Sequence, residues 1–403
     1  MISNKMKETI GSLMEEKYPD MIAMSSYLFK NPELGGEEFK SSRYIADYLA
    51  GEGFKVSFPY EDIPTAFIAE YGNDGLPVIA FVAEYDALPG YGPENKPAHA
   101  CGHNWIAAAM CGCGAVLKEL AAEAGCKVKV IGTPAEETVG SKCDMCRLGT
   151  FDDIDVALQA HLDATSCISP AALAMNSVEF VYTGKAVHAA QFPDKGINAL
   201  DAVILLFSGI NALRQQIRPD ARIHGIITEG GVAVNIIPDR GVCRITFRAN
   251  DRQYVKELRQ RILNIAEGAA KMTGAGLTYS DFENQMDDLL VIPSLVKVVE
   301  DGFASAGLDN FVPVEEHGFP GSTDIGNVSH VCPTLYCELA AEYGKPCFVH
   351  EESALEVVDS EAAHALMKKT VCAFVSAAVE IAEDPSKLAV IKKDFAERNV
   401  CEA

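Results

Sequence analysis

The sequence predicts an α/β fold in which a larger domain on a mainly parallel sheet is interrupted by a smaller α+β domain. At 403 residues the chain exceeds the size at which one hydrophobic core keeps growing. Residues 1–176 alternate helical patterns with short, β-branched apolar runs, an alternation typical of parallel sheets. Residues 177–289 have the pattern of longer strands with turn residues between them, and the alternation of helices and short strands returns over 290–403. The larger domain is therefore predicted to comprise residues 1–176 and 290–403, and the inserted domain residues 177–289.

The first part alternates helices and strands in order. Apolar periodicity predicts helices over 1–20, 44–54 and 106–122. Short runs rich in valine and isoleucine predict strands over 65–72, 77–89, 127–137 and 155–163. Polar residues follow three of these strands, namely Asp86, the pair Glu136–Glu137, and His161. Since sites form beyond the carboxyl ends of parallel strands, these side chains are candidates for one site.

The inserted part is expected to fold as strand, helix, two strands, helix and strand. Strand patterns cover 176–190 and 222–251, and helical patterns cover 198–217 and 252–274. After residue 290 the sequence predicts a helix over 293–307, a strand over 333–340 and a closing helix over 361–384. A small domain inserted into a larger one explains this order.

Composition excludes several classes of partner. The chain has 57 acidic and 34 basic residues, and its net charge of −23 would repel nucleic acid and anionic membrane surfaces.

No apolar stretch approaches the length of a membrane span and no signal peptide is recognised, so a cytoplasmic protein is expected. The 13 cysteines fit a reducing compartment. Cys143 and Cys146 have redox or zinc-ribbon spacing, but the segment around them reads as a helix with two cysteines on one face.

The residues best suited to bind a metal are Cys101, His103, Glu137, His161 and His350. Alone, a Cys-x-His pair before a helix or two adjacent glutamates is usually structural. Together, the five residues supply the sulfur, nitrogen and carboxylate ligands that divalent zinc takes from several loops. The set therefore predicts a metal site.

Seven motifs occur in the order and spacing of one family: "EYDALP", "HACGHN", "GTPAEE", "ALQAHLD", "YTGKAVHAA", "GVAVNIIPD" and "GSTDIGNVSH". The chain resembles the aminoacylase and glutamate-carboxypeptidase family of two-metal peptidases, within its amidohydrolase branch. That branch hydrolyses p-aminobenzoyl-glutamate, indole-acetyl amino acids and β-alanyl-lysine type dipeptides. The resemblance covers nearly the whole chain and implies a metal-dependent hydrolase of N-acyl amino acids or dipeptides.

The resemblance also implies roles for the residues. The five candidate ligands would hold two adjacent divalent ions, with the Cys101 thiolate at or near a bridging place. Zinc is expected first, with manganese, cobalt or nickel as alternatives. Glu136 would be the general acid/base, because an amine leaves poorly unless it is protonated. Asp86 would accept the free N–H of a metal-binding imidazole.

By the same resemblance, the inserted domain is a ferredoxin-like lid that also forms a homodimer. His188 would reach the partner subunit's metals and stabilise the oxyanion, and Asn235 would contact the same region. Ser322 and Thr323 belong to a loop that resembles one lining the family's site, with a simple turn as the alternative.

Some residues depart from the pattern or leave alternatives. Asn104 and Ile106 stand where plant auxin-conjugate hydrolases carry aspartate and histidine, which points to the p-aminobenzoyl-glutamate and dipeptide side of the branch. His330 and His364 are rivals for His350 as the last ligand. The alternative functions are an aminopeptidase-like dipeptidase that requires a free amine, and a metal-binding family member without turnover.

Overall fold

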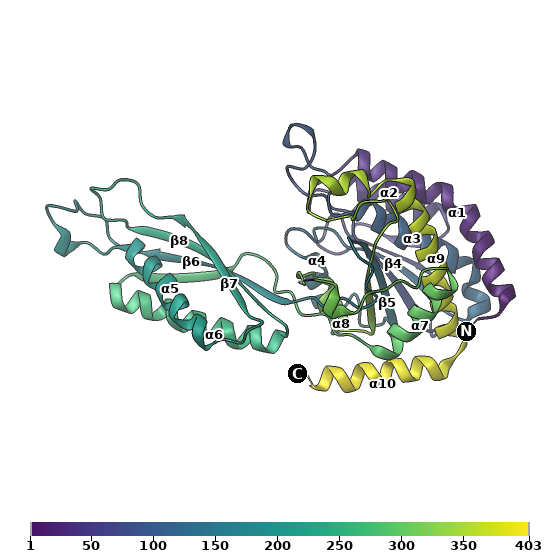
Figure 1. The fold of residues 1–403 in the computed structure, drawn as a ribbon. Helices are drawn as coiled ribbons and strands as arrows, with labels where there is room; N and C mark the ends of the chain where they lie inside the picture. The colour runs from purple at the N-terminus through teal and green to yellow at the C-terminus, as the bar shows by residue number, and fades with distance from the viewer. Residues whose placement is uncertain (1, 319, 402–403) are drawn as a thin grey trace.

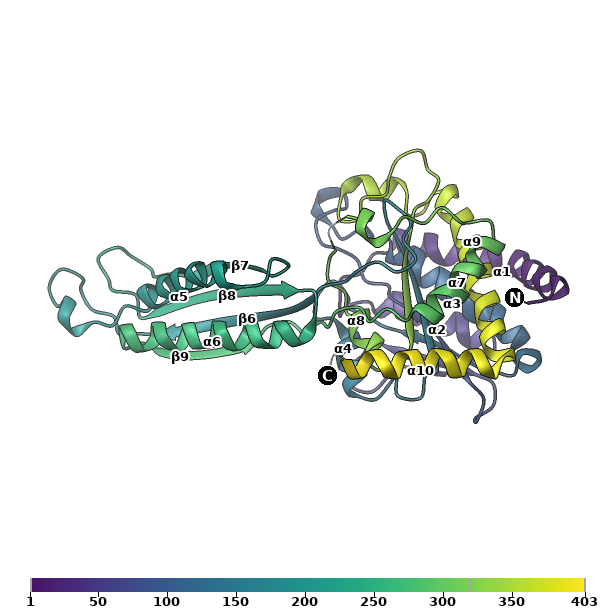
Figure 2. The same ribbon diagram turned by 60° about the horizontal axis from the view of Figure 1, so that its bottom comes forward.

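The computed structural model describes residues 2–318 and 320–401, and it has two bodies (Figure 1). The larger body contains the helices and strands within residues 4–162 and 293–401, and the smaller contains those within residues 174–281. The smaller body extends away from the larger as an elongated arm, and both views show this separation (Figures 1 and 2). The α/β fold with an inserted α+β domain is therefore confirmed.

The larger body consists of a sheet and the helices around it. Its strands are β1 Lys55–Ser57, β2 Phe67–Tyr71, β3 Val78–Ala83, β4 Lys127–Gly132, β5 Val156–Leu162 and β10 Thr334–Leu339. Its helices are α1 Asn4–Lys30, α2 Phe39–Gly51, α3 His103–Ala124, α4 Ser141–Arg147, α7 Pro293–Ser305, α8 Ile325–Ser329, α9 Glu361–Glu383 and α10 Pro385–Cys401. The expected helix around Cys143 and Cys146 is α4.

The six strands follow the order β1-β2-β4-β3-β5-β10. The pairs β4/β3, β3/β5 and β5/β10 are parallel, and β2 runs antiparallel to β1 and β4. Every residue of β3 and β5 is buried, as expected for strands covered on both faces. Four carboxyl ends therefore meet at one edge of this sheet.

Helix α3 is the most apolar helix of the larger body's described residues and crosses the centre of the core. It packs in the same apolar cluster as α1 and α9. By length and composition α3 could cross a membrane, which corrects the expectation that no stretch approaches that length; however, 83% of its most apolar window is buried inside the protein. Its apolar character is thus explained by packing against protein.

The smaller body is a four-stranded antiparallel sheet covered by two helices. Its elements are β6 Ala174–Thr183, α5 Ala199–Leu213, β7 Arg222–Glu229, β8 Arg240–Ala249, α6 Arg252–Thr273 and β9 Gly276–Asp281. The strand order β7-β8-β6-β9 is that of a ferredoxin-like unit. α5 and α6 lie together on one face of the sheet, where they bury a separate apolar core (Figure 1). The boundaries at 177 and 289 stay a prediction.

Candidate metal centre

The candidate site lies where the parallel strands of the larger body end. Asp86 follows β3, Glu136 and Glu137 follow β4, and His161 is the penultimate residue of β5. The loop after β10 adds His350. The two glutamates lie in an irregular turn, so the alternation of a strand does not force them apart.

A tight turn before α3 brings Cys101 and His103 to the same place. Gly102 has a φ of 81°, in the left-handed region that favours glycine. A Cβ at this position would lie 3.3 Å from Cδ1 of Leu162. Glycine therefore permits both the reversal of the chain and the close packing against β5.

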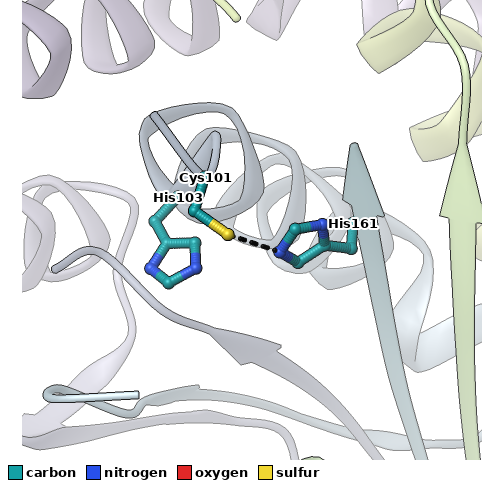
Figure 3. Close-up of side chains that lie close together, drawn as sticks. All are labelled: Cys101, His103 and His161. Carbon is teal, nitrogen blue, oxygen red and sulfur yellow. Dashed lines mark hydrogen bonds between the residues drawn. The ribbon is translucent and has the colours of Figure 1, made fainter. Parts of the chain in front are cut away.

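Cys101, His103 and His161 form the first group of candidate ligands (Figure 3). Sγ of Cys101 lies 3.4 Å from Nε2 of His161. One ligand atom from each of the three buried residues lies within 4.8 Å of the other two. This spacing suits ligands that share one ion.

Hydrogen bonds orient both imidazoles. Nδ1 of His103 lies 2.9 Å from Oδ1 of Asp86, and Nδ1 of His161 lies 2.6 Å from the carbonyl oxygen of Leu162. Both partners are acceptors when Asp86 is ionised, so each Nδ1 donates its hydrogen, and each neutral ring then directs the lone pair of Nε2 into the site. Nε2 of His103 is buried without a hydrogen-bond partner.

A second group consists of Cys101, Glu137 and His350. Nε2 of His350 lies 3.1 Å from Oε1 of Glu137, and the backbone N–H of His350 donates to the carbonyl of Ala100. His350 has a φ of 62°, a strained conformation of the kind that clusters at functional sites. Cys101 belongs to both groups, and a third group joins His103 to Glu136 and Glu137, so the candidate ligands form one continuous cluster.

The rival histidines lie elsewhere. Nε2 of His330 lies 3.0 Å from the carbonyl oxygen of Asp288, and Nε2 of His364 lies 3.0 Å from Oδ1 of Asp359. Neither belongs to a group of candidate ligands among the described residues. The structure therefore brings His350 to the other four candidates and leaves its rivals out.

The charges of the site favour a bound cation. Nε2 of His103 faces Glu84 at 3.6 Å and Glu137 at 3.8 Å. Burial opposes a charge on the ring, but the carboxylates of Glu84 and Asp86 raise the pKa of His103 to about 10. Carboxylates that favour a proton on this nitrogen also favour a divalent ion in its place. The residues therefore fit the expected metals.

Two other groups in the site have raised pKa values in the absence of metal. Burial and the carboxylate of Glu137 raise the pKa of the Cys101 thiol well above its ordinary value, and a bound ion would favour the thiolate. Burial and the carboxylate of Glu84 raise the pKa of Glu136. Glu136 is half-buried beside the ligands, as a group that exchanges protons with a substrate must be.

The centre opens into a cavity of about 590 Å³, a volume suited to a small molecule. Seven predicted residues line it, and five of them are the predicted acid/base and metal ligands Cys101, Glu136, Glu137, His161 and His350. Ser322 and Thr323 line it too, and β8 of the smaller body adds Thr246 and Arg248. Nη1 of Arg248 donates to Oγ of Ser322 over 3.3 Å. Both bodies thus contribute to one cavity.

One part of the cavity wall is acidic and was not predicted from the sequence. Asp163 and Glu338 line the cavity, and both also line an adjoining recess with His317. Nε2 of His317 lies 3.1 Å from Oε2 of Glu338. Burial and the neighbouring Asp163 raise the pKa of Glu338 to about 8. The parallel register of β5 and β10, which pairs His161 with Glu338, could have indicated this position only once the pairing was known.

Four buried charged residues near the centre were also missed. Lys142 lies between Glu84 and Asp324, and Glu38 accepts hydrogen bonds from Oγ1 of Thr65 and the backbone of Ala135. Glu84 had a visible signal, because it precedes Asp86 by two positions at the same strand end. Asp324 had one too, because it follows Ser322 and Thr323 in the motif "GSTDIGNVSH", whereas Lys142 and Glu38 lie in none of the seven motifs.

Two predicted residues lie apart from the centre. His188 and Asn235 are exposed on the smaller body, and neither lines the cavity. They are neighbours, since the backbone N–H of Ala189 donates to the carbonyl of Asn235. Within one chain, the structure does not bring His188 to the candidate ligands.

Comparisons with known proteins agree with this architecture. The model of the peptidase dimerisation domain of the M20 family matches residues 174–273. The Xaa-Arg dipeptidase of Mus musculus is 34% identical over 97% of this chain and 92% of its own length. One of the subunits of the p-aminobenzoyl-glutamate hydrolase of Escherichia coli (strain K12) is 35% identical over 64% of this chain and 56% of its own length.

Among solved structures, a dinuclear metal-binding peptidase of the M20 family from Bacillus subtilis has the same fold. Its TM-score is 0.64 at 22% identity, and the match covers 89% of this chain and 98% of that one. The fold and the relatives define a hydrolase of amide bonds, and the site offers ligands suited to a divalent metal. The chain belongs to the M20 family of peptidases.

Proposed function

We propose that this protein hydrolyses the amide bond of small N-acyl amino acids or dipeptides, using water activated at a centre of two divalent ions. The observation that carries the proposal is the meeting of two ligand groups at Cys101. One group adds His103 and His161, and the other adds Glu137 and His350. The buried, unpartnered Nε2 of His103 supports it, because such an atom is costly unless a cation binds it.

Zinc is the first candidate for both ions, since the donor set is one sulfur, three imidazoles and one carboxylate; manganese, cobalt and nickel are the alternatives. When bound, two such ions lower the pKa of a water molecule from about 16 towards 7 and polarise the scissile carbonyl. The protein must hold the ligands in place, and the bonds of Asp86 and Leu162 to the two imidazoles do so.

Glu136 moves the proton in this proposal. It takes one proton from the attacking water, whose oxygen bonds to the carbonyl carbon, and gives it to the amide nitrogen as the C–N bond breaks. Its place beside Glu137 in the cavity wall supports this role.

The centre is completed across a homodimer. His188 donates a hydrogen bond to the oxyanion in the partner's site, and Asn235 contacts the same region. Support comes from the exposure of both residues and from apolar side chains beside them, since Val232 and Val234 are 89% and 103% exposed. A partner on this body would cover that apolar surface.

Two observations favour dipeptides with a cationic side chain. Asp163, Glu283 and Glu338 give one cavity an acidic wall, and one relative is an Xaa-Arg dipeptidase. Arg248, whose buried Nε has no hydrogen-bond partner, is suited to the terminal carboxylate of such a substrate. A cytoplasmic location accords with the many free thiols.

The test is turnover of a substrate library by metal-depleted protein before and after each metal is restored. The library contains dipeptides with cationic and neutral side chains and their N-acetylated forms. Hydrolysis that disappears on chelation and returns with metal supports the proposal. Hydrolysis that survives complete chelation contradicts it, and cleavage restricted to free amines favours the aminopeptidase-like alternative. If no substrate is turned over, the alternative of a metal-binding family member without turnover is favoured.

A further inference from the structure

Three charged side chains meet in the interior beside the candidate metal centre. Nζ of Lys142 lies 2.7 Å from Oε2 of Glu84 and 2.6 Å from Oδ1 of Asp324. The side chains of Lys142 and Asp324 are 0% exposed and that of Glu84 is 2% exposed. Burying charges in this way is costly and often adds nothing to stability, so the cluster calls for another explanation.

Lys142 occupies only one oxygen of Glu84. The other, Oε1, lies 3.6 Å from Nε2 of His103 and 3.9 Å from Nε2 of His161. The acceptors at Nδ1 of each ring leave both Nε2 atoms as lone-pair donors when the rings are neutral. Three electron-rich atoms therefore face one another, and they repel unless a metal ion lies among them or, in its absence, His103 holds a proton.

We propose that Glu84 is a further ligand of the metal pair, in addition to the five predicted ones, and that Lys142 and Asp324 position it. The inference rests on the metal centre of the proposed function. Glu84 offers a carboxylate oxygen, which is an accepted ligand of zinc and of the other candidate ions.

Lys142 and Asp324 fix which oxygen of Glu84 faces the histidines. Asp324 accepts from the side chain of Lys142 and also, at 2.9 Å, from its backbone N–H. Lys142 is thus tied at both ends, and its ammonium group holds Oε2 away from the centre. With Oε2 fixed, Oε1 is the atom left to bind an ion.

A purely structural role for the cluster is the competing explanation, since it joins β3, α4 and the start of α8. The two explanations differ in what happens when Glu84 loses its charge but keeps its shape. Glu84→Gln retains an oxygen that can accept from Lys142, so a structural role predicts unchanged metal binding. A ligand role predicts weaker binding, because an amide oxygen donates more weakly to a divalent ion than a carboxylate.

The experiment is a titration of metal-depleted, full-length protein with cobalt(II), read from the d–d absorption bands. These bands report the number and kind of ligands, and bound metal is also counted by elemental analysis. The proposal expects Glu84→Gln to bind at least one ion about tenfold or more weakly and to shift the bands. Unchanged affinity and unchanged bands would overturn it.

Glu52→Gln is the matched control. Glu52 is also largely buried and bonded to lysines, Lys17 and Lys118, and the substitution should leave the bands unchanged. Glu84→Asp, which keeps the charge but is one methylene shorter, serves if Glu84→Gln does not fold; binding equal to that of the parent then contradicts the proposal. If the parent itself binds no cobalt, it is the proposed function that fails.

Discussion

The candidate metal centre and the surface around His188 differ in how completely one chain builds them. The ligands of the centre are mostly buried, and a carboxylate and a carbonyl orient two of its imidazoles. His188 is exposed, and its Nδ1 accepts from the backbone N–H of Ala190 in its own turn. The comparison teaches that one chain supplies all of the candidate metal ligands, whereas stabilisation of the transition state is proposed to depend on a second chain.

The largest predicted effect is the loss of turnover on replacing Glu136, and it distinguishes this proposed proton carrier from the proposed ligand Glu137. Glu136→Gln keeps the shape of the side chain and removes its basicity, so turnover should fall by at least about a hundredfold while the metal content holds. Glu137→Gln should lower the metal content too. Turnover and elemental analysis of both variants check this, and two active, metal-loaded variants would show that neither glutamate has its proposed role.

The next effect concerns His188. Its replacement by alanine should lower turnover by about a hundredfold, which is the size expected for loss of an oxyanion donor, with metal content unchanged. Mixing His188→Ala with Glu136→Gln under conditions that exchange subunits should restore part of the activity, because one site of each hybrid dimer then has both groups. If His188→Ala is inactive and its activity is not restored in hybrid dimers shown to have formed, His188 acts on the site of its own chain.

Much of the candidate metal centre could be predicted from the sequence, because the motifs at the strand ends contain residue types that are specific metal ligands. Glu84, Lys142 and Asp324 could not be recognised as a cluster, since they come together only when β3, α4 and α8 pack. Lys142 has the sequence context of an ordinary surface lysine, and nothing local shows that it is buried. The exposure of His188 likewise depends on how the inserted body extends, which no local pattern specifies.

The acidic wall should affect binding more than chemistry. Above about pH 8, where Glu338 carries its charge, Glu338→Gln should raise KM for a dipeptide with a cationic side chain about tenfold, because one charge facing the ligand is worth roughly 1–2 kcal/mol in a partly buried site. KM for a neutral dipeptide and kcat for both should change little. Steady-state kinetics on the matched pair check this, and an equal change in both KM values would remove the acidic wall from substrate selection.

The remaining effect is on stability and not on turnover, and it comes from Glu38, which accepts the backbone N–H of Ala135 beside Glu136. Burial and the carboxylate of Asp86 raise its pKa from 4.5 to about 7. The folded protein therefore holds this proton more tightly than the unfolded chain, and stability falls as pH rises between these values. The free energy of unfolding of the metal-free parent, compared with that of Glu38→Gln, should fall by about 3 kcal/mol over that pH interval. Denaturant unfolding at several pH values measures it, and a difference independent of pH contradicts the assignment.

The central claim is that two metal positions share Cys101, and counting the bound ions tests it most directly. Elemental analysis after dialysis should find two divalent ions per chain in the parent and one in His350→Ala, which removes a ligand from a single group. Cys101→Ala should weaken both positions and retain fewer ions than His350→Ala. A parent without divalent ions, or a Cys101→Ala variant that keeps both of them, would contradict the account.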